Sequence, residues 1–304
     1  MYNGKVIMLK TVAQNLSVSA TTKDGAKPLG RDNRYWTRLH AFDLATGKLQ
    51  WIAESATSVH SASLLNRTVD GRNAILTGRG GGHEPPEEPY GLSAIDADSG
   101  ETIWDLPMRG YAAHQNAVWR DDRGGAFVGM QHHLVDMQNG VLQPAVSLVE
   151  NVHLRQFKNG HYVSTPNTRL PAHKKNKAIT YHTNCLVGDF HYFRTFNDHF
   201  IGRINVSTSK VEYLQVPVQV VREANKETVS WDKATENDVK NSDGFVVCQD
   251  RRAKLSGWGH VSAPSPIVVG DHLYVPTMIG MVYVIRWNTS ELDDSALVSI
   301  SDLG

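Results

Sequence analysis

The chain has 304 residues, enough to bury a sizeable core as one large domain or two smaller ones. Lys and Arg total 31 and Asp and Glu also total 31, so the formal charge is zero. A balanced charge gives no long-range field of one sign, which argues against nucleic acid or an anionic membrane as the partner. No apolar run approaches the roughly 18–20 residues that a membrane span needs.

The two cysteines, Cys185 and Cys248, are far apart and lack the spacing of a cysteine zinc site. They permit one disulfide but no disulfide framework. The segment Met1 to Lys5 has no secretory apolar region, so no signal peptide is expected in this sequence.

Taken in chain order, residues 3–9 predict a turn followed by a strand, and the polar residues 14–34 predict a loop insertion. Residues 38–51 then alternate in polarity up to Asp43, turn at Gly47 and continue into a strand that carries Trp51. The pattern recurs at residues 91–104, and more weakly downstream. Its equivalent residues are Asp96, Gly100 and Trp104 in the second copy, Asp136 and Gly140 in the third, Asn205, Ser209 and Tyr213 in the fourth, and Arg286 and Ser290 in a degraded fifth.

Each copy is interpreted as a β-hairpin. An Asp or Asn before the turn accepts hydrogen bonds from amides two residues on, and glycine accepts the positive φ that the turn needs. A tryptophan at a fixed offset has too large an apolar face for one sheet to bury, so it is expected to pack on a neighbouring unit. A repeat of about 40 residues with one docking aromatic predicts a β-propeller.

A second repeated element, strand, Gly-Asp turn and strand, precedes the hairpin at residues 181–193 and 259–275. The two elements together predict four-stranded blades, of which about five are visible in the sequence. Further insertions are expected at residues 78–90, 151–178 and 218–256. They are interpreted as solvated loops, with a substrate lid as the alternative.

The segments 41–51 and 94–104, supported by residues 3–6 and 262–271, resemble the pyrroloquinoline-quinone-like repeats of the quinoprotein alcohol dehydrogenase-like propellers. The resemblance implies an all-β propeller of seven or eight blades, so residues 1–304 are either a single smaller propeller domain or a fragment. It also implies a bacterial periplasmic or secreted location. The adjacent cysteines, calcium ligands and catalytic Asp of the quinone enzymes have no match here, so pyrroloquinoline quinone is disfavoured as a cofactor.

Four histidines open the strand that follows a hairpin and precede Ser or Asn within three residues: His60, His114, His182 and His260. Equivalent positions of successive blades surround the channel of a propeller, so these imidazoles are candidates for a divalent metal site or for acid-base catalysis. The alternative is that each fills a repeated structural position, and His153 competes with His182 for one of them.

The sequence therefore favours a binding or scaffold module that receives a small molecule or a protein at the mouth of the channel. The competing hypothesis is an enzyme, hydrolytic or redox, that uses a metal held by the histidines. The Gly78–His83 segment resembles a phosphate cradle but lacks the following Lys-Ser/Thr, so a loop is preferred. Trp231 and Trp258 are the apolar residues expected on exposed loops if the chain is a protein-interaction platform.

Overall fold

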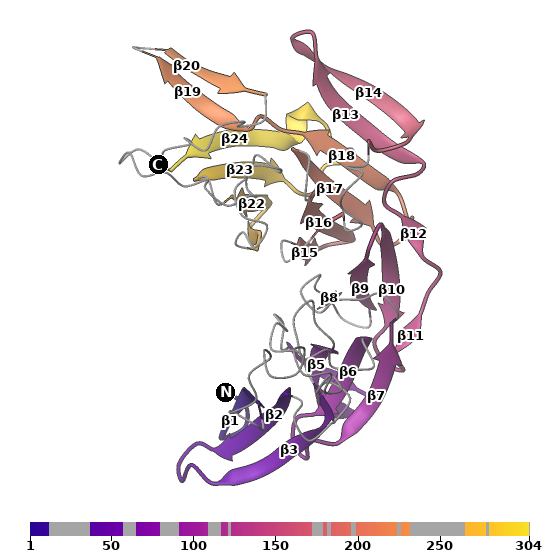
Figure 1. Cartoon of the computed structure of the whole chain (residues 1–304), viewed down its shortest axis with the longest axis vertical. Helices are drawn as coiled ribbons and strands as arrows, with labels where there is room; N and C mark the ends of the chain where they lie inside the picture. Colours follow the sequence, from indigo (N-terminus) through magenta and orange to yellow (C-terminus); the bar gives the residue numbers. More distant parts are fainter. Residues whose placement is uncertain are drawn as a thin grey trace, which may run out of the picture. The chain divides into compact units, whose positions relative to one another are not determined.

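The computed structural model (Figure 1) describes residues 1–11, 37–56, 65–79, 91–108, 117–120, 123–171, 179–180, 184–195, 199–223, 226–231, 265–277 and 280–303. These residues form strands and one short 3-10 helix. The chain divides into two compact units, Met1–Val128 with His133–Pro144, and Gly129–His132 with Ala145–Gly304. None of the helical residues in the described ranges forms a segment long and apolar enough to cross a membrane.

Two antiparallel sheets of the first unit are consecutive in the sequence. One has the order β1-β2-β3 and consists of β1 (Lys5–Thr11), β2 (Thr37–Asp43) and β3 (Leu49–Ala56). The next has the order β4-β5-β6-β7 and consists of β4 (Leu65–Val69), β5 (Arg72–Arg79), β6 (Gly91–Asp96) and β7 (Thr102–Pro107). A third sheet, of order β11-β10-β9-β8 with β12 also on β10, consists of β8 (Ala117–Arg120), β9 (Arg123–Val128), β10 (Gln131–Asp136), β11 (Val141–Leu142) and β12 (Val146–Ser147).

The second unit contains a six-stranded sheet of order β14-β13-β18-β17-β16-β15. Its strands are β13 (Val152–Lys158), β14 (His161–Thr168), β15 (Asn184–Val187), β16 (Phe190–Arg194), β17 (Phe200–Asn205) and β18 (Val211–Gln215), and only the β13–β18 pair is parallel. A hairpin of β19 (Gln219–Glu223) and β20 (Lys226–Ser230) follows. The last sheet has the order β21-β22-β23-β24, with β21 (Ile267–Val269), β22 (His272–Pro276), β23 (Met281–Arg286), η4 (Asp294–Ala296) and β24 (Leu297–Asp302).

The predicted turns are confirmed in four hairpins. Asp43 Oδ1 accepts from the Thr46 amide at 2.7 Å, and the turn residue Gly47 has a φ of +68°. Asp96, Asp136 and Asn205 accept in the same way, before Gly100, Gly140 and Ser209, whose φ values are also positive. Ser290 does not adopt this conformation. The last hairpin turns instead through η4, which Asp293 caps by accepting from the Ser295 amide at 3.0 Å.

Tryptophans pack between successive sheets, as the repeat predicted. The indole of Trp51 on β3 lies against Gly100, and that of Trp104 on β7 lies against Gly140. Trp104 Nε1 also donates to the Met137 carbonyl at 3.1 Å, which fixes the ring across the contact. In the second unit Trp287 lies against Gly188 in the same manner. These contacts bury apolar faces that a single sheet leaves open.

The protein is therefore all-β and is built from β-propeller blades. Four consecutive strands lie in meander order in β4–β7 and β21–β24 and, within larger sheets, in β8–β11 and β15–β18. Together with the three-stranded sheet β1–β3 they make five blade-type sheets within the described ranges, in agreement with the number expected. The expected insertion at 151–178 contains the hairpin β13–β14, which extends the fourth blade, and the one at 218–256 begins with β19–β20. The insertion 14–34, residues 80–90 and residues 232–256 lie outside the described ranges.

Candidate functional site

The four histidines that the sequence singled out, His60, His114, His182 and His260, all lie outside the described residues. Their convergence on a metal or catalytic site therefore stays a prediction. The repeat residues are placed: Asp43, Asp96, Asp136 and the glycines that follow them are turn residues, and Trp51 and Trp104 pack between sheets. In the described ranges no three His, Cys, Asp or Glu side chains come together as a metal site.

Three strands of the first unit end at one edge, and two of them, β3 and β7, precede the candidate histidines His60 and His114 in the sequence. β5 and β7 run in the same direction because each pairs antiparallel with β6. β3 runs with β7, since Trp51 lies at Gly100 and Ser55 lies farther along at Asp105. The three strands therefore end at the same edge, which we call the ligand edge, and it is opposite to the Gly47 and Gly100 turns.

Arg79, the last residue of β5, is buried at this ligand edge, with 4% of its surface exposed. Its Nη1 lies 3.5 Å from Oδ2 of Asp105 on β7. The other oxygen of Asp105 accepts from Ser93 Oγ at 2.6 Å and from Ser55 Oγ at 2.9 Å. Two serines on neighbouring strands thus hold the carboxylate that orients Arg79.

Two donors of Arg79, Nε and Nη2, are buried and have no hydrogen-bond partner in the described part of the chain. Burial lowers the pKa of the Arg79 guanidinium, although Asp105 opposes that shift, so the side chain is a desolvated cation. Each buried donor left unsatisfied costs about 1–3 kcal/mol. A polar group placed against this side of the guanidinium would recover that free energy.

The equivalent position in two other blades shows that Arg79 is an exception. In those blades the position is occupied by Thr195, just after β16, and by Thr277, just after β22. Like Arg79, each threonine lies five residues beyond the strand residue that pairs with the first residue of the hairpin turn. Thr277 Oγ1 donates to the Met281 carbonyl at 3.1 Å and accepts from the Met281 amide at 3.1 Å, and Thr195 brackets Phe200 in the same way. The hydroxyl of a threonine at this position finds its hydrogen-bond partners in the nearby backbone, whereas Nε and Nη2 of Arg79 find none among the described residues.

A second buried polar group lies in the other unit, around His132 on β10 and His191 on β16. His132 Nε2 and His191 Nδ1 are 2.8 Å apart, and His191 Nε2 is 3.1 Å from the amide oxygen Oδ1 of Asn184. Since Oδ1 can only accept, His191 Nε2 carries the proton and Nδ1 accepts from His132. Burial and the nearby His132 hold the pKa of His191 well below its ordinary value, so the ring is neutral. The group joins β10, β15 and β16.

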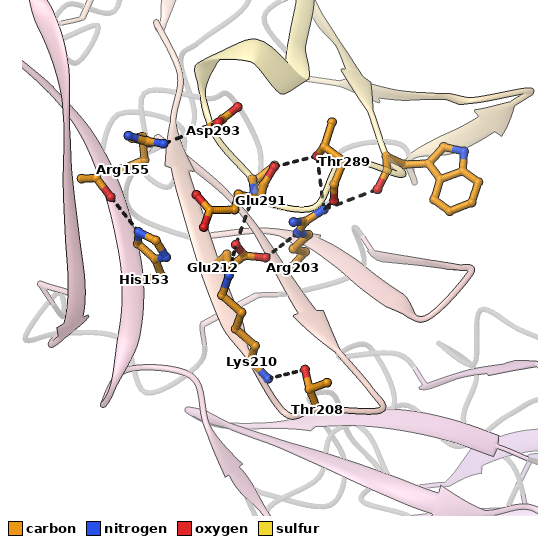
Figure 2. A network of polar contacts seen from close by, with 12 residues as sticks. His153, Arg155, Arg203, Thr208, Lys210, Glu212, Thr289, Glu291 and Asp293 are labelled. Carbon is orange, nitrogen blue, oxygen red and sulfur yellow. Dashed lines mark hydrogen bonds and ion pairs between the residues drawn. The ribbon is translucent and has the colours of Figure 1, made fainter.

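A third group surrounds the ion pair of Arg203 and Glu212 (Figure 2). Arg203 Nε donates to Glu212 Oε2 at 2.7 Å, and Lys210 Nζ lies 2.9 Å from Oε1. Arg203 Nη1 crosses to the following blade, where it donates to the Thr289 carbonyl at 2.9 Å. Tyr192 also crosses, because its hydroxyl donates to the Trp287 carbonyl at 2.8 Å. The group therefore ties the β15–β18 blade to the turn that follows β23, and the charge of Arg203 is paired with Glu212, although Arg203 Nη2 is a buried donor with no hydrogen-bond partner among the described residues.

Comparisons with known proteins give a fold-level likeness only. No protein-family model matches the chain, and no curated protein matches its sequence. Similar solved structures are BamB from Moraxella catarrhalis, at 14% identity over 89% of this chain and 72% of BamB with a TM-score of 0.37, and a europium-containing methanol dehydrogenase, at 12% identity over 88% of this chain and 47% of the other with a TM-score of 0.48. Sqt1 from Saccharomyces cerevisiae is similar at 8% identity over 84% of this chain and 54% of Sqt1, with a TM-score of 0.43.

The chain spans about half the length of the methanol dehydrogenase and of Sqt1. Such low identities and TM-scores assign neither a family nor an activity, so the fold is argued from the blades themselves.

Sequence reasoning missed the residues at the centre of all three groups. Arg79 was included in a loop insertion, and it is instead the last residue of a strand. Once the blades are aligned on their hairpin turns, Arg79 falls where two of the other blades carry threonine and the first carries Lys10, and the difference from threonine was the available signal. Arg203 and Glu212 face each other across β17 and β18, so their pairing was open to a register argument from the hairpin turn. His132 and His191 are 59 residues apart, so their contact depends on long-range packing.

Proposed function

We propose that the chain is a ligand-binding module of the propeller class that receives a small molecule or a protein at the ligand edge, where β3, β5 and β7 end. In a propeller this edge surrounds one mouth of the central channel. The proposal retains the sequence resemblance to quinone-type repeats, and with it the periplasmic or secreted location that this resemblance implies. It assigns the chain no chemistry of its own.

One observation carries the proposal: Arg79 keeps two unsatisfied buried donors at the ligand edge. Arg203 keeps one such donor, Nη2, but its Nε and Nη1 bind Glu212 and the next blade, so its guanidinium serves the contact between two blades. Unsatisfied polar groups are rare in folded proteins, and they are expected where a ligand completes the site. We therefore expect the blades to form a rigid frame and the ligand to bind at the strand ends of the ligand edge.

A mixed library of acids, amines and neutral compounds, observed by ligand NMR, tests the location. A paramagnetic label on Glu54→Cys, at the exposed end of β3, samples the ligand edge, and one on Lys48→Cys samples the opposite turns. Both variants are made in a background where Cys185 and Cys248 are serine. Bound compounds should relax faster with the label at residue 54. Binding only near residue 48, or to neither edge, would overturn the proposal.

The competing enzyme hypothesis rests on the four repeated histidines, and metal analysis separates it from the binding module. The untagged protein is purified without chelator and its transition-metal content is measured, alongside His60→Ala, His114→Ala, His182→Ala and His260→Ala. A binding module should hold no stoichiometric metal in any of the five proteins. If the wild-type protein holds stoichiometric metal and the variants lose it, the binding-module hypothesis is wrong and the hypothesis of a metal-dependent enzyme takes its place.

A further inference from the structure

The guanidinium of Arg79 has one side paired with Asp105 and one side buried with unsatisfied donors. Its end is oriented by Asp105 through Nη1, while Nε and Nη2 are both buried without a partner. These two atoms carry N–H bonds that point the same way, at the spacing of the two oxygens of a carboxylate. We propose that Arg79 binds the carboxylate of a ligand through this pair of donors. The inference names the ligand class for the proposed function and rests on it for the ligand edge.

Charge selects a carboxylate over a phosphate dianion. Arg79 and Asp105 together carry no formal net charge, and among the residues that the structure describes Asp105 is the one acidic partner of Arg79. A carboxylate brings the group to a single negative charge, whereas a phosphate dianion would bring two beside the Asp105 oxygen. Because the guanidinium is buried, like charges there repel more strongly than in water. A neutral amide offers one acceptor oxygen and no charge, so it cannot form the two parallel charge-assisted hydrogen bonds that a carboxylate forms.

The geometry is set before any ligand arrives. Asp105 is fixed by Ser55 Oγ at 2.9 Å and Ser93 Oγ at 2.6 Å, from two different strands. Asp105 in turn holds Nη1, so the planar guanidinium is restrained and little side-chain entropy remains to be lost on binding. In two other blades the residue at this strand end is satisfied within the chain, because Thr195 and Thr277 bond the backbone of the next strand. In this blade the same position carries a buried pair of unsatisfied donors.

Titration calorimetry with acetate, propionate and butanoate tests the inference on the full chain, with propionamide and inorganic phosphate as the matched neutral and dianionic probes. The variants are Arg79→Met and Arg79→Lys, because lysine keeps the charge but cannot present two parallel donors. The control is Arg72→Met, at the other end of the same strand, where the half-buried arginine makes long ion pairs of 3.7 Å with Asp96 and 3.9 Å with Glu101. Saturable binding of the carboxylates is expected, weakened at least about tenfold by both Arg79 variants and unchanged in the control.

A second readout does not depend on how the variants fold. In the wild-type protein the ¹⁵Nε–H signal of Arg79 should shift and exchange more slowly with solvent as acetate is added, and it should not respond to propionamide. An unchanged signal would overturn the inference, because the donors would then be satisfied by water or not at all. Tighter binding of phosphate than of carboxylates, or carboxylate binding that survives in both Arg79 variants, would overturn it as well. If amines or neutral compounds bind at the ligand edge and carboxylates do not, the carboxylate inference is wrong, whereas the proposed function at the ligand edge is retained.

Discussion

Trp51 lies so close to Gly100 that a Cβ built on the glycine would stand 2.8 Å from Cε3 of the indole. Trp104 and Gly140 repeat the relationship in the next pair of sheets, at 2.6 Å. Gly100 also has a φ of +81°, so backbone conformation and side-chain contact both demand glycine there. Gly47 has a similar φ of +68° and no atom within 4 Å of the same point. The two turns therefore separate the cost of the conformation from the cost of the contact.

Gly100→Ala should destabilise the protein more than Gly47→Ala. The left-handed conformation costs a residue with a Cβ about 1–2 kcal/mol in both variants. The added methyl at residue 100 also forces the indole of Trp51 to move, at about 1–3 kcal/mol more. Urea unfolding followed by tryptophan fluorescence measures the two free energies. Equal losses in the two variants would show that Trp51 does not depend on the bare glycine.

Glu212→Gln should lower stability at neutral pH by about 3–5 kcal/mol, because it leaves Arg203 buried beside a neutral partner. Burial alone would raise the pKa of Glu212, but Arg203 and Lys210 outweigh it and hold that pKa below its ordinary value of 4.5. A lowered pKa means that the unfolded chain takes up the proton first, so the stabilisation is present above pH 4.5 and is lost as the pH falls below it. Unfolding free energies measured from pH 7 to pH 3 should therefore fall less steeply in the variant.

Glu101→Gln serves as the control for this ion pair. Its carboxylate is exposed and reaches Arg72 only at 3.9 Å, so its removal should change stability by less than about 1 kcal/mol. If the two variants behaved alike, the Arg203–Glu212 pair would not be what joins the two blades.

The repeat could be read from the sequence because its signals are local. Asp43, Gly47 and Trp51 act within one hairpin and its neighbour, and turn chemistry together with one large aromatic predicts both. The site could not be read in this way. Whether the Nε of Arg79 finds a partner depends on Asp105, Ser93 and Ser55, which lie on three strands that only the fold brings together. Sequence periodicity does not show whether a buried side chain finds its hydrogen-bond partners.

The same distinction applies to Trp231. The sequence suggested an exposed aromatic on a loop, whereas the indole is half-buried and stacks on Phe157 with a centroid distance of 4.0 Å and an interplanar angle of 4°. Tyr162 closes the group edge-on at 5.6 Å. The contact holds the end of β20 against the β13–β14 hairpin, so this residue is part of the packing.

Trp231→Ala should therefore release the β19–β20 hairpin, at a cost of about 2 kcal/mol for the lost area and stacking. Hydrogen exchange should accelerate in residues 219–230 and stay unchanged in β4–β7. Val229→Ala, at a position 43% exposed on the same hairpin, should alter stability by about 0.5 kcal/mol or less. Unchanged exchange in the hairpin of Trp231→Ala would mean that other contacts hold it.

The buried His191 predicts a loss of stability on mild acidification. Burial first, and then the charge of His132, hold the pKa of His191 well below the ordinary value of 6.5. The unfolded chain binds a proton there below pH 6.5 and the folded chain does not, so stability is full above pH 6.5 and falls as the pH drops, by up to about 1.4 kcal/mol per pH unit for this one group. His191→Phe should be less stable at pH 8, because it leaves Asn184 Oδ1 and His132 Nε2 without their bond to His191. It should also lose less stability between pH 7 and pH 5 than the wild type does, and His161→Gln, at an exposed hairpin position, should retain the wild-type slope. A slope that is the same in His191→Phe and in the wild type would show that the proton is taken up elsewhere.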